Sequence, residues 1–363
     1  MAPSLETLPM EVIGNVSSHL KVIDLRSAAS TSRTMNNGVS TMLFHSIGFS
    51  GDRQTLKFKL LEFLNVEASG KAGIVIRSAR SVAIRVTENG LLTGYREEAV
   101  FLPALMISVL GKLTRAQYLV IDIGGLTSSE QTAFGTQVRR AVGLPLYRHL
   151  VSGLVRSPYD RVQRALADNL TSVKITQLVR DRDISLLVET CPDLRRLALT
   201  LEDPIFDYVK FLPQGNNPPS LNVVGLENLE WLILNNKINL RYRRVEDPES
   251  FLEAIQNVSQ AFSGMGNLTK LSISVATRTL QWVENSDLAK GTDERHDLQD
   301  TFLDAVGVMA DEIDTLLDAC IVEGDTVLGK TYRGLQQEAL QFRIHIGYIR
   351  NTPGDTFPRG LMH

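Results

Sequence analysis

Cysteine, long apolar runs and an excess of charge of one sign are all scarce in this chain of 363 residues. Its two cysteines, Cys191 and Cys320, lie far apart and belong to no CxxC or Cys/His cluster, so we expect neither a disulfide framework nor a zinc site. No run of about 18 apolar residues occurs, so no membrane span is expected. A formal net charge of -3 indicates no binding to nucleic acid or to an anionic membrane.

Patterns that carry catalysis are missing as well. The six histidines have no metal spacing, no serine sits in a G-x-S-x-G elbow, and the carboxylates are dispersed. We therefore expect a non-catalytic protein with no metal and no cofactor. No secretory signal is visible, so we expect a cytoplasmic or nuclear protein with two free thiols.

The first fifty residues carry the pattern of short helices. Pro9 suits the first position of a helix, and Val12, Val16 and Leu20 then recur at four-residue spacing along one apolar stripe. Asp24 is expected to cap a second helix.

The second helix is expected to run from Leu25 toward Arg33 and to be broken at Asn36-Asn37-Gly38. A third helix would carry Val39, Met42, Leu43 and Phe44. Three helices in about forty residues make a core that is marginal alone, so a partner should cover the remaining apolar face.

Residues 4–48 resemble the F-box family. The motif residues follow in the family's order and spacing: Leu8-Pro9-x-Glu11-Val12-Ile13, Val16, His19-Leu20, Asp24-Leu25, and Ala28 to Arg33. One departure is Met35, where the family often has tryptophan. The resemblance implies docking on a Skp-type adaptor and, through it, on a cullin. The implied adaptor-binding residues are Leu8, Pro9, Val12, Ile13, Val16, Leu20, Asp24 and Leu25. A helical hairpin that caps the larger domain is the alternative.

A second pattern recurs past residue 75: an apolar residue, two others, an apolar residue, one other, and an apolar residue. This is the strand half of a leucine-rich repeat, so a parallel sheet with helices on its outer side is expected. The copies are Ala79-Val82-Ile84, Ala116-Leu119-Ile121, Leu170-Val173-Ile175, Leu194-Leu197-Leu199, Leu229-Leu232-Leu234, Leu268-Leu271-Ile273 and Ala339-Phe342-Ile344. A different α/β domain with coincidental strings of this kind is the alternative.

The repeat is irregular, and the gaps between copies must hold helices and insertions. Helices are expected around Ile184-Leu187-Val188 and Phe251-Ile255-Val258-Phe262, and loops at 203–225 and 284–300. The predicted fold class is α/β, with a small all-α three-helix F-box module followed by an irregular leucine-rich-repeat-like solenoid. The predicted domains are an F-box at 4–48, the repeat domain at 49–350 and a flexible tail at 351–363.

Gly324 to Thr331 matches the phosphate-binding P-loop pattern. That loop needs a buried strand before it and a helix after it, whereas Ile313, Leu316, Leu317, Cys320 and Ile321 are spaced as in an amphipathic helix. We therefore expect a turn before the last repeat rather than a nucleotide site.

The residues between the inward positions of each strand should form the concave face, where a target would bind. These include Val120, Asp122, Thr176, Thr200, Asn235 and Ser272. The residues chosen as target-binding are Tyr118, Lys174, Arg196, Trp231, Ile233, Lys270 and Arg343. Trp231 between Arg196 and Lys270 is the expected centre, because tryptophan and arginine are enriched at interface hot spots. Packing of Trp231 under an insertion loop is equally open.

The sequence thus predicts the substrate-recognition subunit of an SCF-type (cullin-RING) ubiquitin ligase, which would hold an unknown target protein. The alternative is an F-box scaffold or inhibitor outside a ligase, and a second alternative is a nucleotide-binding enzyme or switch.

Overall fold

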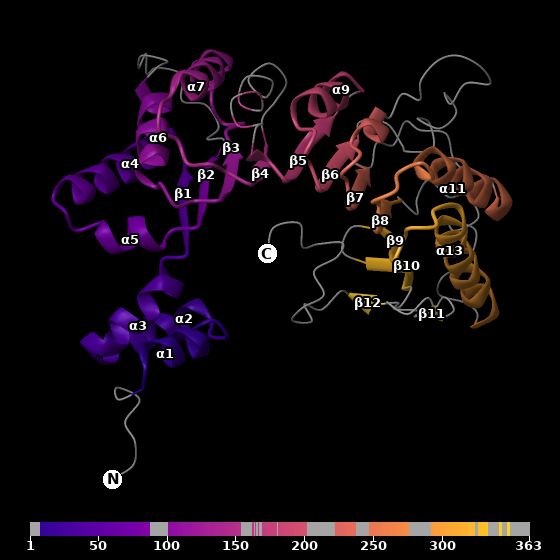
Figure 1. Cartoon of the computed structure of the whole chain (residues 1–363), viewed down its shortest axis with the longest axis horizontal. Coiled ribbons are helices and arrows are strands. Elements are labelled where there is room, and N and C mark those ends of the chain that lie inside the picture. Colours follow the sequence, from indigo (N-terminus) through magenta and orange to yellow (C-terminus); the bar gives the residue numbers. More distant parts are fainter. Residues whose placement is uncertain are drawn as a thin grey trace, which may run out of the picture. The chain divides into compact units, whose positions relative to one another are not determined.

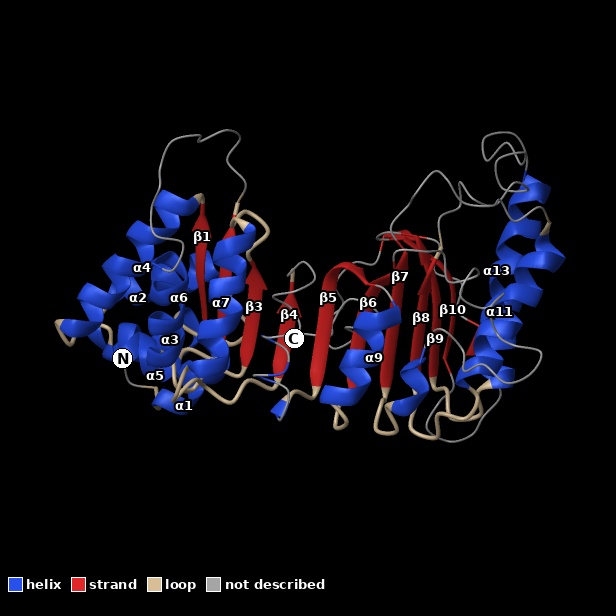
Figure 2. Cartoon of the chain, turned by 90° about the horizontal axis from the view of Figure 1, so that it is seen from above, coloured by secondary structure: helices blue, strands red, loops and turns tan. Residues whose placement is uncertain are grey.

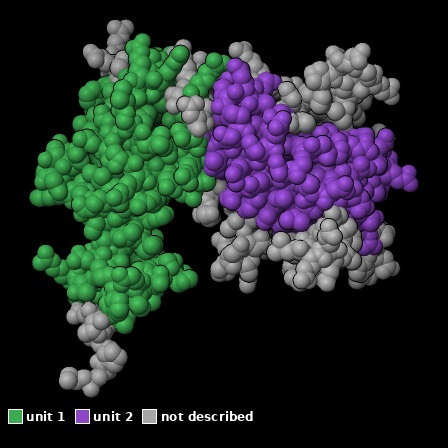
Figure 3. All heavy atoms as spheres, in the orientation of Figure 1, with its two compact units in different colours: residues 1–169 green, residues 170–363 purple. Residues whose placement is uncertain are grey.

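The computed structural model is a mixed α/β protein with a mostly parallel sheet, as the sequence predicts. It describes residues 8–87, 101–153, 162, 164, 166, 169–179, 181–201, 222–236, 247–275, 292–323, 326–332, 341–342 and 347–348. Two compact units divide the chain, residues 1–169 and 170–363 (Figure 3). Each unit is described by itself.

The first unit begins with three helices and continues with strands and helices in alternation (Figure 1). Its elements are α1 (Met10–Ser17), α2 (Val22–Thr31), α3 (Arg33–Leu43), β1 (Ser46–Gly51), α4 (Arg53–Ala68), α5 (Gly73–Ser78), β2 (Ser81–Val86), α6 (Phe101–Lys112), β3 (Tyr118–Asp122), α7 (Ser128–Arg140) and β4 (His149–Ser152). Strands β1 to β4 are parallel and follow one another in chain order. Helices α4, α6 and α7 lie along one side of these strands.

The second unit repeats this plan with longer connections. Its elements are β5 (Ser172–Val179), α9 (Asp181–Thr190), β6 (Arg196–Leu201), the 3-10 helix η3 (Asn222–Gly225), β7 (Trp231–Asn236), α11 (Pro248–Phe262), β8 (Lys270–Ser274), α13 (Thr292–Glu312), β9 (Asp318–Glu323), β10 (Thr326–Tyr332), β11 (Gln341–Phe342) and β12 (Gly347–Tyr348). Strands β5 to β9 are parallel neighbours in chain order, and β10 then turns back antiparallel to β9 (Figure 2). Both β11 and β12 pair with β10.

The predicted strand pattern is confirmed at β2, β3, β5, β6, β7 and β8. In each described copy all three apolar positions are buried. Of the last predicted copy only Phe342 is described, and it lies in β11, antiparallel to β10. Arg343 and the predicted tail at 351–363 lie outside the described residues.

Three further strands follow the same plan and were missed. Strand β1 has only Phe49 fully buried, and β4 begins after Tyr147 with Leu150 as its one buried leucine. Strand β9 follows the spacing Leu316, Ala319, Ile321. The prediction of an amphipathic helix from Ile313 to Ile321 is therefore wrong: α13 ends at Glu312, and the buried residues that follow belong to a turn and a strand.

One backbone carbonyl before each strand joins neighbouring repeats. It accepts hydrogen bonds from two successive N–H groups at the start of the next strand. In the second unit the Thr171 oxygen accepts from Arg195 and Arg196 at 2.9 and 3.1 Å, and the Arg195 oxygen accepts from Glu230 and Trp231 at 2.7 and 3.0 Å. The same arrangement recurs at the carbonyls of His45, Arg80, Gln117, Glu230 and Thr269. Within each unit, β2 to β4 and β6 to β9 therefore start in the same register as the strand before them.

Side-chain caps begin several helices. The Asp52 carboxylate accepts from the Thr55 N–H at 2.8 Å, and Asp247 accepts from the Ser250 N–H at 2.7 Å just before Pro248. The predicted helices around residues 184–188 and 251–262 are confirmed as α9 and α11. The predicted loop at 284–300 is wrong in part, because 292–300 belong to α13, and residues 222–225 of the other predicted loop form η3.

Helices α1 to α3 pack around a small core of Ile13, Leu25 and Val39, and we call these three helices the N-terminal helical module. The second helix starts at Val22, so Asp24 lies inside its first turn rather than at its cap. The predicted break at Asn36-Asn37-Gly38 is also wrong, because these residues lie within α3. The break falls at Ser32 instead, whose extended backbone ends α2 and whose hydroxyl accepts from the Met35 N–H at 3.2 Å.

Gly38 is needed in mid-helix because α3 approaches α1 closely there. A Cβ at this position would stand 2.5 Å from Ile13 Cγ2 and 3.2 Å from Ile13 Cβ. Gly38→Ala should therefore lower the free energy of unfolding of the module by about 1–3 kcal/mol, the usual cost of overpacking. Hydrogen exchange of the α1–α3 amides in the full chain would measure this change.

Gly14→Ala is the matched control, since Gly14 lies in α1 with nothing within 4 Å of the added Cβ. Alanine's helix propensity should there raise stability by about 0.5–1 kcal/mol. Equal stabilisation by both alanines would contradict the close packing of α3 on α1.

Candidate interaction surfaces

The N-terminal helical module leaves much of its apolar surface outside its own core. Of the residues predicted to bind an adaptor, Ile13 and Leu25 are buried in that core, and Leu8 packs partly against it. The others are exposed: Pro9, Val12, Val16, Leu20 and Asp24. Met35 also packs against the core, so this departure from the F-box pattern serves the module's own interior.

Three more exposed apolar residues were missed by the sequence analysis. Met10, Val22 and Ile23 stand on α1 and α2, and Ile23 keeps 70% of its surface accessible. We call Met10, Val12, Val16, Leu20, Val22 and Ile23 the apolar surface of the module. Ile23 comes just before Asp24, where the sequence predicts the second helix to start. An apolar residue outside a predicted helical stripe carries no periodic signal, so the sequence did not mark Ile23 as part of a surface.

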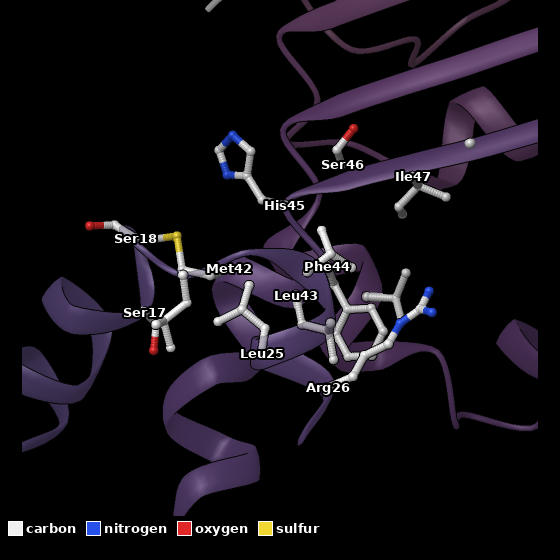
Figure 4. Close-up of a pocket in the computed structure, with 14 residues that line it drawn as sticks. Ser17, Ser18, Leu25, Arg26, Met42, Leu43, Phe44, His45, Ser46 and Ile47 are labelled. Carbon is white, nitrogen blue, oxygen red and sulfur yellow. The ribbon is translucent and has the colours of Figure 1, made fainter. Parts of the chain in front are cut away.

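A groove of about 630 Å³ continues this surface toward the first strand. Leu20 lines it from the connection between α1 and α2, and Val22 and Leu25 line it from α2. Phe44, just before β1, and Ile47, within β1, line the other side. Figure 4 shows Arg26 and His45 among the lining residues, so the apolar walls carry two basic side chains. The groove therefore suits a partner's apolar side chain with an acidic neighbour.

The second surface lies on the sheet of the second unit, on the strand positions that alternate with the buried leucines. The shared register places Ser172, Arg196, Trp231, Lys270 and Asp318 side by side on five neighbouring strands. We call these residues the first row. The predicted centre of the target-binding surface is thus assembled in space from segments far apart in the chain.

Trp231 stands between two cations of this row. The Arg196 guanidinium lies 4.3 Å from the centre of its ring and the Lys270 ammonium 4.6 Å. The two side chains come from β6 and β8, which flank β7, so the indole separates them. Such cation–π contacts attract the two cations to the faces of the indole and so favour these side-chain positions.

Asp318 is the negative member of the first row, and its side chain is 3% exposed. Lys270 Nζ lies 3.6 Å from Asp318 Oδ2, and Lys330 Nζ lies 3.4 Å from Oδ1. One buried carboxylate thus holds two ammonium groups, so the described cluster of Arg196, Lys270, Lys330 and Asp318 carries a net positive charge.

On β6, β7 and β8 the next row of positions is buried, which corrects the predicted exposure of Ile233 and Ser272. On β5 the same row holds Lys174, which is half-buried. Ile233 is buried with Ala198, Cys320, Val322 and Val327, and Trp231 packs against this cluster. Because the residues at these positions are apolar, they form a second small core on this face of the sheet.

In the first unit, Tyr118 lies in register with His149. Their rings stack, with centroids 4.2 Å apart and an angle of 11° between the ring planes. Val120 is half-buried and Asp122 is exposed. Arg343, the last predicted target-binding residue, lies outside the described residues. Burial raises the pKa of the Tyr147 phenol above its ordinary value, because the hydroxyl sits in the core at the start of β4.

The P-loop-like segment is part of an antiparallel hairpin. Gly324 and Asp325 lie outside the described residues, and Thr326 to Thr331 belong to β10, paired with β9. The segment is thus a strand and not the predicted turn. A Cβ on Gly329 would stand 2.5 Å from the Phe302 carbonyl oxygen, so this glycine allows β10 to approach α13. Lys330 pairs with Asp318. Gly329 and Lys330, two residues of the P-loop pattern, therefore both have structural roles here.

Asp318→Asn should lower the free energy of unfolding by about 1–3 kcal/mol, because it removes the buried negative charge that pairs with both Lys270 and Lys330. Denaturant unfolding of the full chain would measure the change. Glu230→Gln is the control, because it also replaces a carboxylate by an amide of the same shape. Glu230 pairs with Arg195 at 3.2 Å in an exposed setting, so this substitution should cost less than about 1 kcal/mol. A larger loss for Glu230→Gln would contradict the role assigned to Asp318.

Within the described ranges, no helix is long and apolar enough to cross a membrane, and no group of three potential metal ligands occurs. A scan against protein-family models gives no match for this chain, and a search of curated proteins gives none either.

Proposed function

We propose that this chain is the substrate-recognition subunit of an SCF-type ubiquitin ligase. The N-terminal helical module acts as an F-box that binds a Skp-type adaptor, and the strand–helix repeats form an irregular leucine-rich-repeat-like solenoid that binds a target protein. The chain itself supplies no catalytic group in this role. It brings the target close to the ligase's catalytic subunits, which raises the effective concentration of the target there.

One observation carries the proposal: a module with a core of three residues exposes a larger set of apolar side chains than it buries. Full burial of a Val, Leu or Ile side chain is worth about 1.5–3 kcal/mol, and partly exposed ones would gain correspondingly less. Burial of Val12, Val16, Leu20, Val22 and Ile23 together supplies enough free energy for a specific interface. These residues lie within the segment that follows the F-box motif.

The repeats support the second half of the proposal. Within each unit the repeats add parallel strands side by side, and one carbonyl links each repeat to the next. The repeats of β2, β3 and β5 to β8 bury the same three apolar positions. That is the plan of a solenoid, in which neighbouring repeats complete one another's cores. The described sheet face of the second unit carries aromatic and basic side chains in one row, a composition typical of protein-binding surfaces.

Val16→Glu combined with Ile23→Glu should abolish co-purification of the Skp-type adaptor, because each change places a charge at the centre of the apolar surface. Both side chains are more than half exposed, and glutamate favours helices more than valine or isoleucine does, so the module should stay folded. Pull-down of the full chain with adaptor and cullin is the measurement, and circular dichroism checks the fold.

Val142→Glu is the control, since Val142 is fully exposed in the same unit but outside the module. It should leave adaptor binding unchanged. Adaptor binding that survives the double change would sink the proposal, and adaptor captured without cullin would indicate a scaffold outside a ligase.

A further inference from the structure

We propose that Arg196 and Lys174 form an anion-binding site that holds a carboxylate or phosphate group on an extended acidic segment of the target. The inference rests on the proposed role of the repeats as a target-binding surface, and it names the chemistry that this surface selects. It concerns the second unit alone and needs no adaptor.

Arg196 is half-buried and is oriented by the Trp231 ring. Among the described residues no carboxylate lies within ion-pair distance of its guanidinium. A stacked arginine loses little further freedom when it binds, and its planar fork matches two oxygens of a carboxylate or phosphate. Arg196 is therefore an oriented donor whose guanidinium has no carboxylate partner among the described residues.

Lys174 is the second cation of the site. Ser172 pairs with Arg196 and Lys174 pairs with Ala198, so Lys174 projects from the same sheet face as Arg196 on the adjacent strand. Strand spacing and rise place the two backbones roughly 8 Å apart, within reach of one shared group for two long side chains. Within the part of the chain that the structure describes, Lys174 also has no ion-pair partner.

The neighbouring cations Arg195, Lys270 and Lys330 each have a carboxylate partner within the protein, which leaves Arg196 and Lys174 to bind an external anion. Lys270 and Lys330 share the Asp318 carboxylate, so part of their charge is neutralised inside the protein. Arg195, adjacent to Arg196 in sequence, points to the other sheet face and pairs with Glu230. Arg196 and Lys174 are thus the described cations of this face with charge left to offer a ligand.

The occupant is an extended chain rather than a small ion because the first row runs across the strands. From β6 to β9 it spans roughly 14 Å at the spacing of sheet strands, about the length of four extended residues. An acidic group at one end of such a segment meets Arg196 and Lys174, and the rest of the segment lies beside Trp231 and the Lys270–Asp318 pair.

The test uses the full chain and three labelled ten-residue peptides: one with six glutamates, one with a single phosphoserine in a Gly/Ser background, and that background peptide alone. Fluorescence anisotropy gives the affinities. We expect the glutamate peptide, the phosphoserine peptide or both to bind with a Kd below about 1 mM, and the background peptide to bind at least tenfold more weakly. Binding of only one anionic peptide identifies whether carboxylate or phosphate is the preferred group.

Arg196→Gln and Lys174→Gln should each raise the Kd of the anionic peptide about tenfold or more. Arg195→Gln is the matched control, because it removes the same charge one residue away on the other face and should change affinity less than threefold. A second readout is the emission of Trp231 in a Trp282→Phe background, which should change on peptide binding in the parent and not in Arg196→Gln.

Two results would overturn the site: no binding of either anionic peptide at 1 mM, or an equal loss from Arg195→Gln and Arg196→Gln, which would show only unspecific charge attraction. If Arg196→Gln proves unstable by circular dichroism, Lys174→Gln and Arg196→Lys decide instead, since lysine keeps the charge but lacks the fork and should still weaken binding. Failure here leaves adaptor binding by the module untouched, and loss of adaptor binding leaves this result standing.

Discussion

The shared carbonyl before each strand is the interaction on which the rest of the structure depends. It accepts from two successive N–H groups of the following repeat, so β2 to β4 and β6 to β9 each start level with the strand before them, whatever the length of chain between them. Insertions of different size therefore change the connections but leave the sheet in register. This explains how a repeat too irregular to show a period in sequence still builds a regular parallel sheet.

Register also turns distant residues into neighbours. Arg196, Trp231, Lys270 and Asp318 each take the first position of their strand, and level strand starts bring them together. Because side chains alternate between the two faces of a strand, the first position of β6 to β9 presents a charge or an indole, while the second and fourth positions bury apolar side chains on the opposite face. Ile233 and Cys320 are buried in the next row, so on β7 and β9 only the first row is left to face a ligand. On β5 the next row stays accessible at Lys174.

Much of the sheet could be predicted from sequence, because apolar residues two and three positions apart mark most strands. At β4 the pattern fails because Ser152 takes the last apolar position. Strand β9 keeps the pattern as Leu316, Ala319 and Ile321, but the helical spacing of the surrounding apolar residues pointed to a helix. A longer pattern would have found β9, since an apolar residue three positions before the first one, such as Leu226, Met265 or Ile313, is buried in the turn ahead of the strand. At Gly38 the error was different, because close packing on Ile13 overrode the usual preference of Asn-Gly for a turn.

The two candidate surfaces differ in what sequence alone can say of them. A periodic stripe identifies the apolar face of a helix, but in a module this small the stripe divides between core and surface, and only the packing of Ile13 and Leu25 against Val39 shows which residues remain exposed. On the sheet the reverse holds, since the alternation of strands predicts the face and the shared carbonyls supply the neighbours. Exposed apolar side chains suit a partner that stays bound, whereas a row of oriented charges suits a ligand that must be chosen and released. Under the proposed function, the module would keep the adaptor and the sheet would exchange the target.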